Sequence, residues 1–181
     1  MGIVLWHVTM SLDGFIAGPG DDMDWIFEYA GPSAVVDEVI RTTGAIVAGR
    51  HTYDVGRRDA GKASGAPYGG AWSGPIFVLT HRPQVGEEDP AITFVSGDIE
   101  GVVANAMAAA DGNNVEVFGA DVAHQALERG LVDEILVHIA PLLLGDGVRL
   151  FGRPGAARIN LEPIAVTRAE KVTDLRYRVV R

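Results

Sequence analysis

The sequence has no cysteine among its 181 residues. Disulfide bonds, thiolate metal sites and cysteine nucleophiles are therefore excluded. No apolar run approaches the roughly 20 residues that a membrane-spanning helix needs, and the residues after Met1 lack the basic stretch that opens a secretory signal peptide. These absences predict a cytoplasmic protein with no membrane partner.

Clustered positive charge is missing as well. The formal net charge is −9, and Lys and Arg are nowhere interleaved with aromatic residues, so a nucleic-acid partner is not expected. The histidines show no metal-ligand spacing, and no P-loop, HExxH motif or nucleophile elbow is present. The sequence thus predicts no metal and leaves the chemistry to an organic cofactor. His7 and His138 lie in strand-like runs and are interpreted as hydrogen-bonded residues of a core or sheet.

The hydrophobic pattern predicts one α/β domain over residues 1–181, because nearly half of the residues are hydrophobic and short β-rich runs alternate with helical segments. Such alternation is typical of a mainly parallel sheet with helices on both faces. The expected strands are 3–10, 45–48, 76–79, 92–95, 115–118 and 135–139, with an antiparallel pair at 159–167 and 171–180. One expected helix begins at Ser33 and ends at Gly44. Two others cover 99–110 and 122–129, and a further short helix follows Arg50.

Several turns follow apolar runs directly. Because ligands of open α/β sheets bind beyond the carboxyl ends of the strands, we expect these turns to converge on one groove. The segments concerned are Ser11–Ala17, Val47–Tyr53, Val78–Arg82 and Val117–Asp121.

Two of these turns suit a phosphorylated cofactor. Gly49 lets a ligand approach the backbone, and Arg50 and Thr52 add hydrogen-bond donors at the start of the following helix. Thr80 and Arg82 place a hydroxyl and a cation after a strand, which suits a ribose 2′-phosphate and makes Arg82 the candidate that distinguishes NADPH from NADH. The competing interpretations are a plain helix start with a solvated arginine and a solvated loop.

A third turn, Gly119-Ala120-Asp121, precedes a helix whose N–H groups and dipole can face a pyrophosphate. It is not the GxGxxG fingerprint of dinucleotide-binding folds. The competing interpretation is that Asp121 serves as the N-cap of that helix.

Two residues are candidates for substrate contact. Asp13 stands in an Asp-Gly turn, and turn formation is the competing explanation for it. Trp25 either lines a pocket or anchors the start of a helix. The segment 11–24 is predicted to be a loop long enough to act as a lid, and 56–74 to be a rim loop or a partner contact.

The order of these motifs resembles the dihydrofolate reductase-like superfamily, and within it the reductase family typified by the C-terminal domain of the bifunctional riboflavin-biosynthesis protein. The resemblance covers nearly the whole chain, through Ser11–Ala17, Gly130–Glu134, Leu144–Gly147 and Arg149–Phe151. It implies a three-layer α/β/α sandwich with a mixed, mostly parallel sheet, NADPH as the cofactor, a homodimer, and hydride transfer to a pyrimidine-like or pterin-like ring.

The resemblance also assigns cofactor contacts. Phosphates would touch Gly49, Arg50 and Thr52; the adenosine end would touch Leu79, Thr80 and Arg82; the pyrophosphate would touch Phe118, Gly119, Ala120, Asp121 and Val122; and Ala17 would lie against the nicotinamide.

One departure from the family pattern guides the choice of substrate. Dihydrofolate reductases have a carboxylate a few residues after a tryptophan of the first helix, whereas counting from Trp25 leads to 30–33, where no acid stands. This favours a reductase of a small heterocycle, with 5-amino-6-(5-phosphoribosylamino)uracil of the riboflavin pathway as the first candidate, over dihydrofolate reduction. Two further hypotheses are a non-catalytic NADPH-binding protein of the same fold and a dimeric scaffold without a cofactor.

Overall fold

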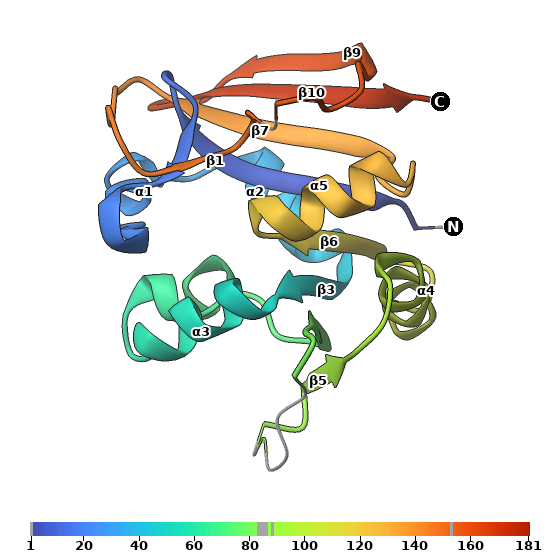
Figure 1. Cartoon of the computed structure of the whole chain (residues 1–181). Coiled ribbons are helices and arrows are strands. Elements are labelled where there is room, and N and C mark those ends of the chain that lie inside the picture. The colour runs from blue at the N-terminus through green and yellow to red at the C-terminus, as the bar shows by residue number, and fades with distance from the viewer. Residues whose placement is uncertain (1, 83–86, 88, 153) are drawn as a thin grey trace.

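The computed structural model describes residues 2–82, 87, 89–152 and 154–181. Its centre is an eight-stranded sheet in the order β5-β4-β3-β6-β1-β7-β10-β9 (Figure 1). Neighbouring strands from β5 to β7 are parallel, whereas β10 and β9 are antiparallel to their neighbours. The strands are β1 (Val4–Ser11), β3 (Thr43–Gly49), β4 (Ile76–Leu79), β5 (Ile92–Val95), β6 (Asn114–Phe118), β7 (Glu134–Ala140), β9 (Asn160–Arg168) and β10 (Thr173–Val180). The predicted mixed, mostly parallel sheet is confirmed.

Helices cover both faces of this sheet, with α5 in front and α2 behind in the view of Figure 1. The helices are α1 (Asp24–Tyr29), α2 (Ala34–Thr42), α3 (Arg50–Arg58), α4 (Ile99–Ala109) and α5 (Ala120–Glu128). Ser33 is the predicted N-cap of α2, and its hydroxyl accepts a hydrogen bond from the Val36 N–H at 3.3 Å. Within the described part of the chain, no helix combines the length and the apolar content needed to cross a membrane.

The alternation of side chains along β1 divides the core into two parts. Trp6 faces α4 and α5 in the larger hydrophobic cluster, whereas Leu5 packs against Val39 of α2 on the opposite face. Trp6 is only 1% exposed and meets the His124 ring edge to face, with ring centroids 5.2 Å apart. Because successive strand residues point to opposite faces, polar residues that share the register of Leu5 lie on the α2 face.

The segment 11–24 is more ordered than predicted. It contains strand β2 (Phe15–Ala17), which pairs with β8 (Val148–Arg149), and the one-turn helix η1 (Pro19–Asp21). The Leu150 N–H also donates to the Gly14 carbonyl oxygen at 2.9 Å. The prediction of one continuous loop was wrong, because residues more than 130 positions away supply the partner strand.

The segment 56–74 likewise folds against its own sheet. It completes α3 and then forms the short helices η2 (Ala63–Gly65) and η3 (Pro67–Gly70). Trp72 is buried, and its indole N–H donates to the Thr43 carbonyl oxygen at 3.0 Å. This tryptophan and Tyr68 cover part of the α2 face, so the segment is more ordered than the predicted rim loop, and the alternative of a partner contact stays a prediction.

Gly44 does not end α2, as the sequence predicted. Thr43 is the C-cap, and Gly44 is already part of β3, at an irregularity in the pairing of β3 with β6. A Cβ atom at Gly44 would lie 2.5 Å from the Ala110 carbonyl oxygen and 2.8 Å from the Ala110 Cα. Glycine is required here by close backbone packing and not by a left-handed turn.

We expect Gly44→Ala to lower the free energy of unfolding by about 1–3 kcal/mol, because the added methyl group meets backbone atoms that cannot rotate away. Urea unfolding measures this change. Gly31→Ala is the matched control, since a Cβ atom there meets nothing within 4 Å. Equal stability of the two variants would contradict the packing argument.

Candidate functional site

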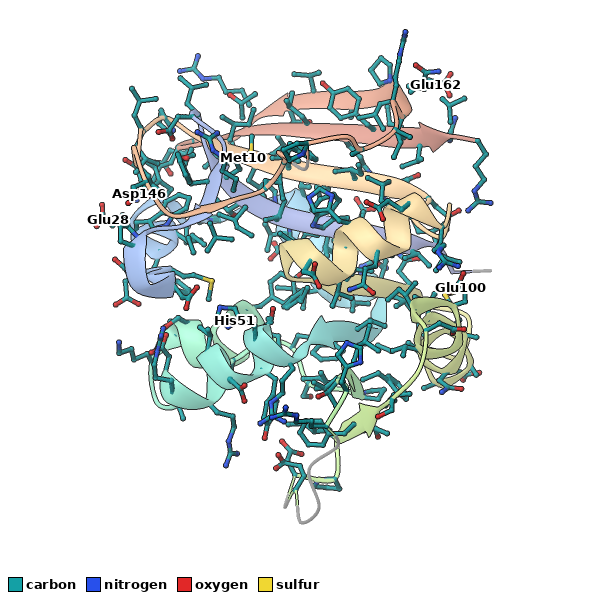
Figure 2. All side chains as sticks on the ribbon, in the orientation of Figure 1. Met10, Glu28, His51, Glu100, Asp146 and Glu162 are labelled. Atoms are coloured by element: carbon teal, nitrogen blue, oxygen red, sulfur yellow. The ribbon has the colours of Figure 1, made fainter. Side chains whose placement is uncertain are left out.

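A cavity of about 670 Å³ lies on the α2 face of the sheet, between α1 and α3. Its walls include Ile26 and Phe27 of α1, Thr52 of α3, and Thr9 and Phe118 near the carboxyl ends of β1 and β6. Figure 2 places His51 on the α3 side of this hollow and Glu28 on the α1 side. Its volume falls in the range of pockets that enclose a small organic ligand.

Two strand-to-helix turns meet at the rim of this cavity. α3 follows β3 directly and α5 follows β6 after Gly119, and the two strands are adjacent and parallel, with Ala48 opposite Phe118. A Cβ atom at Gly119 would lie 2.3 Å from the Thr52 hydroxyl oxygen. A Cβ atom at Gly49 would lie 2.8 Å from a methyl carbon of Val122. The tertiary fold therefore joins two predicted turns that are 70 positions apart.

The backbone at both helix starts is suited to an anion. Gly49 and Gly119 are the N-cap residues of α3 and α5, and neither helix has a side-chain cap within the described residues. Gly119 has φ +92° and ψ +138°, which favours glycine. The first N–H groups of each helix and the positive ends of the helix dipoles point toward this rim. Asp121 is not the N-cap of α5, so that interpretation was wrong; its carboxylate accepts from the Gln125 side-chain amide at 2.9 Å.

A second group of predicted residues lies at the end of β4. Arg50 forms an ion pair with Asp54 at 2.8 Å, and its guanidinium donates to the Arg82 carbonyl oxygen at 3.4 Å. Thr80 is buried, and its hydroxyl oxygen accepts from the Arg82 N–H at 3.1 Å. Thr80 thus shapes the turn that carries the exposed Arg82 side chain, and Leu79 packs against the core beneath it.

The cavity therefore gathers part of the predicted cofactor set. Among the described residues, those of the set that line it are Ala17, Thr52, Phe118, Gly119 and Ala120. The others are Gly49, Arg50, Leu79, Thr80, Arg82, Asp121 and Val122, which lie behind the rim or toward β4.

Neither candidate substrate residue belongs to the described lining of the cavity. The Asp13 carboxylate accepts from the Ser11 hydroxyl at 2.6 Å and from the N–H groups of Leu144 and Gly145 at 3.1 and 2.7 Å. The Ser11 hydrogen bond, together with these backbone N–H groups, lowers the pKa of Asp13 below its ordinary value. Trp25 is buried in α1 against Tyr29, and its indole nitrogen is buried with no hydrogen-bond partner among the described residues.

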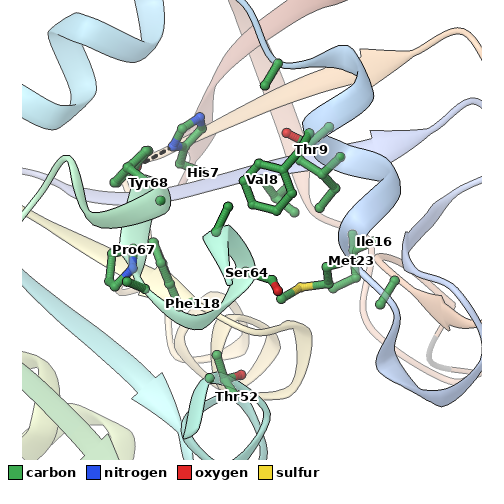
Figure 3. Close-up of a pocket in the computed structure, with 18 of the residues that line it drawn as sticks. His7, Val8, Thr9, Ile16, Met23, Thr52, Ser64, Pro67, Tyr68 and Phe118 are labelled. Atoms are coloured by element: carbon green, nitrogen blue, oxygen red, sulfur yellow. Dashed lines mark hydrogen bonds between the residues drawn. The ribbon is translucent and has the colours of Figure 1, made fainter. Parts of the chain in front are cut away.

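Sequence reasoning missed the most polar part of the cavity wall. His7 and His138, correctly predicted to be hydrogen-bonded sheet residues, also line the cavity together with Tyr68. Figure 3 shows the hydrogen bond between Tyr68 and His7, with Phe118 and Thr52 in the same pocket. The available signal was a single ionisable residue inside each of three apolar strand runs: His7, Glu116 and His138.

Within the described residues, no group of three or more His, Asp or Glu side chains is arranged to hold a metal ion. The pKa of His138 is lowered by burial and by the neighbouring His7, against the opposing effect of Asp174. The pKa of Tyr68 is raised, first by burial and then by the charge of Glu116. The polar wall is thus built from proton-carrying side chains.

Comparison with known proteins identifies the family. The RibD C-terminal domain family matches residues 3–173. The chain belongs to this family. The resemblance drawn from the sequence motifs is confirmed.

Two proteins are similar to this chain over most of its length. The uncharacterized protein YwjB of Bacillus subtilis is 24% identical over 147 residues, which is 80% of each chain. A putative riboflavin biosynthesis protein from Shewanella sp. PV-4 is 25% identical, with a TM-score of 0.80 and full coverage of both chains.

More distant structures share the fold. Rib7, the yeast riboflavin biosynthesis reductase from Saccharomyces, is 16% identical, with a TM-score of 0.65 over 99% of this chain and 90% of its own. A diaminohydroxyphosphoribosylaminopyrimidine deaminase/5-amino-6-(5-phosphoribosylamino)uracil reductase from Thermotoga maritima is 16% identical, with a TM-score of 0.68. The present chain covers 57% of that longer protein.

The hydrogen bonds to Asp13 predict a specific acid sensitivity. Because its pKa is lowered in the folded state, Asp13 contributes stability above its unfolded value of 3.8, and that contribution is lost as the pH falls through the lower folded value. We expect Asp13→Asn to be less stable than the wild type near neutral pH, with the difference shrinking in acid. Urea unfolding from about pH 7 to about pH 3 measures the difference.

Asp111→Asn is the charge-matched control, at an exposed turn with φ +48° that asparagine tolerates. A stability difference for Asp13→Asn that stays constant across this pH range would contradict the assignment.

Proposed function

We propose that this member of the RibD C-terminal domain family is an NADPH-dependent reductase that transfers a hydride to a small heterocyclic compound. The first substrate candidate is 5-amino-6-(5-phosphoribosylamino)uracil, which the name of the Thermotoga relative includes. The single observation that carries the proposal is the meeting of the α3 and α5 N-termini at the rim of the cavity. We also retain the homodimer and the cytoplasmic location as predictions.

The rim fits a dinucleotide diphosphate. Uncapped N–H groups of two helices supply hydrogen-bond donors, and the absence of a Cβ atom at Gly119 lets the Thr52 hydroxyl lie beside the start of α5, where it adds a further donor. The proposed adenosine end lies toward the end of β4, where Arg82 is exposed beside Arg50. Positive groups at this position offset the acidic net charge of the protein locally.

The cavity fits the nicotinamide end of the cofactor, which reacts with the substrate. When bound, NADPH supplies the hydride. Ala17 offers a small side chain on one wall, and the apolar residues of α1 exclude water from the opposite side. The volume of about 670 Å³ accommodates a nicotinamide together with one substrate ring.

Dihydrofolate reduction is the second candidate. Residues 30–33 line the cavity, and they include no acid. The acidic residues among the described lining are Asp21, which is hydrogen-bonded to His51 at 3.0 Å, and Glu170, and neither belongs to α1. The wall therefore favours a pyrimidine-type substrate over a pterin that needs a carboxylate from the first helix.

The direct test combines binding and turnover with the full-length protein. NADPH at about 100 times its Kd is expected to stabilise the fold by about 2.7 kcal/mol, and absorbance at the NADPH band is expected to fall when an aminopyrimidine substrate is added. Stabilisation without NADPH oxidation across a panel of pterins and aminopyrimidines would favour the non-catalytic binding protein. No stabilisation by either nicotinamide cofactor would overturn both.

Arg82→Ala tests the cofactor preference. We expect the Kd for NADPH to rise by about 10-fold to 100-fold, since a hydrogen bond to a charged group contributes about 1.5–3 kcal/mol, while the Kd for NADH changes little. Isothermal titration calorimetry measures both constants. Arg178→Ala, which removes an exposed arginine on β10, is the matched control. Equal losses for the two cofactors in Arg82→Ala would remove the role assigned to Arg82.

A further inference from the structure

Five side chains, buried or half-buried, form a continuous polar row across four neighbouring strands. The row runs Glu116, Tyr68, His7, His138, Asp174. The Tyr68 hydroxyl bonds to Glu116 Oε2 at 2.5 Å and to His7 Nδ1 at 2.7 Å. His7 Nε2 lies 2.6 Å from His138 Nε2, and His138 Nδ1 lies 2.6 Å from Asp174 Oδ1.

The strand register explains why these residues meet. Leu5 is paired with Glu116, Thr9 with His138, and His138 with Asp174. Paired residues point to the same side of a sheet, as do residues two apart on one strand. Glu116, His7, His138 and Asp174 therefore all project from the α2 face, the face of the cavity. Tyr68 reaches this row from η3.

The hydrogen bonds of the row need one more proton than the five side chains carry when both carboxylates are ionised and both histidines are neutral. Four hydrogen bonds join the five residues. With both carboxylates ionised and both histidines neutral, only the Tyr68 hydroxyl and one nitrogen of each imidazole bear a proton. One of the four contacts would then join two acceptors. A fourth proton completes the row, held on a carboxyl group or as an imidazolium, and it can move along the row by switching the direction of each hydrogen bond.

Tyr68 is the member of the row best placed to contact a substrate bound in the cavity. It is half-buried, lines the cavity, and sits in a short helical turn, whereas the other members stand on strands. Its backbone has φ +54° and ψ +33°, a left-handed conformation that is costly for an aromatic residue. Gly69 and Gly70 follow with φ +64° and +90°. This strain is retained in a turn that holds the hydroxyl between Glu116 and His7.

We propose that the polar row is a proton relay whose outlet is the Tyr68 hydroxyl, which protonates the substrate atom that receives the displaced electron pair. The proposal rests on the reductase function proposed above. It supplies the proton donor that the sequence motifs did not reveal, and it makes Tyr68 a catalytic residue and His7, His138 and Asp174 positioning residues.

The step balances as follows. The substrate carbon of a C=N or C=O bond gains the hydride, with NADPH oxidised to NADP⁺, and the π electron pair of that bond moves onto the heteroatom. The heteroatom takes the proton of the Tyr68 hydroxyl, and the tyrosine oxygen takes the proton of His7 Nδ1. His138 then replaces the proton of His7, and the row regains one proton from solvent between turnovers.

The electrostatics support a concerted transfer. Burial and Glu116 raise the pKa of Tyr68, so the hydroxyl is a weak acid unless His7 replaces its proton at the same time. Burial and His7 lower the pKa of His138, so an imidazolium at this position releases its proton more readily. The other carboxylate, histidine and cationic side chains among the described cavity lining are Asp21, His51, Arg57, Glu170 and Lys171. Arg176 forms an ion-pair cluster with Glu134 and Glu38 beside the row.

The pH dependence of turnover tests the relay. In the wild type, kcat is expected to fall as rising pH removes the fourth proton. Tyr68→Phe is expected to lower kcat by about 10²-fold or more and to abolish this fall, while the Kd for NADPH measured by calorimetry stays within about twofold of the wild type. An unchanged pH profile in Tyr68→Phe would overturn the proposal.

Asp174→Asn tests the far end of the row, which does not touch the substrate. Removing this carboxylate destabilises the protonated row, so the apparent pKa of kcat is expected to shift to lower pH. Glu162→Gln, an exposed carboxylate on the neighbouring β9, is the matched control. An apparent pKa that moves equally in both variants, or in neither, would contradict coupling along the row.

A measurement without cofactor or substrate separates this proposal from the reductase function. Long-range ¹H–¹⁵N NMR spectra of the free protein report the protonation of each imidazole nitrogen. His7 and His138 are expected to titrate together, and Asp174→Asn is expected to shift the signals of both rings. Independent titration of the two rings would overturn the relay even in an active reductase. Coupled titration in a protein that oxidises no NADPH would instead overturn the reductase function, and with it the delivery of the proton to a substrate.

Discussion

The pairing of β3 with β6 is the contact on which the rest of the site depends. The two strands are far apart in sequence, yet their parallel pairing brings the turns after Ala48 and Phe118 side by side. The close approach of Gly119 to Thr52 leaves no room for a Cβ atom between the two helix starts. A shift of one residue in this register would turn the buried side chains of β6 to the opposite face and separate the turns.

The same pairing also decides where charge can be buried. Glu116 lies in the middle of β6 between Val115 and Val117, and it is fully buried. A lone carboxylate in such a place would carry a large desolvation cost. Hydrogen bonds from Thr43 and Tyr68 compensate for the lost water. A sheet that tolerates this residue therefore requires the segment around Tyr68 to fold back over it, which explains why this segment is ordered.

In the proposed reductase, the polar wall and the helix rim would serve different parts of one reaction. The rim offers backbone N–H groups to a phosphorylated ligand, a contact that needs little from the side chains. The wall offers a hydroxyl and two imidazoles inside a largely apolar cavity, where electrostatic interactions are less screened than in water. Both belong to a member of the RibD C-terminal domain family with about 24–25% identity to relatives of similar length.

Local patterns predicted most elements well, since apolar runs and caps are local properties. β4 and β5 match the predicted ranges, and the cap of α2 is the predicted Ser33. The failures came where a distant segment supplies the partner. β2 exists because β8 pairs with it, and Gly44 lies in β3 because α4 ends against it. No local signal announces either contact.

The amino-acid sequence by itself determined the class of fold, the turns that suit a phosphorylated ligand, and the absence of cysteine chemistry. It did so because residue types, periodicity and turn chemistry act over a few neighbouring positions. Only the tertiary structure decided that Asp13 fastens the 144–145 backbone and that His7, Tyr68 and His138 share one cavity wall. The reason is that strand register, which sets which distant side chains meet on one face, depends on the packing of the whole sheet.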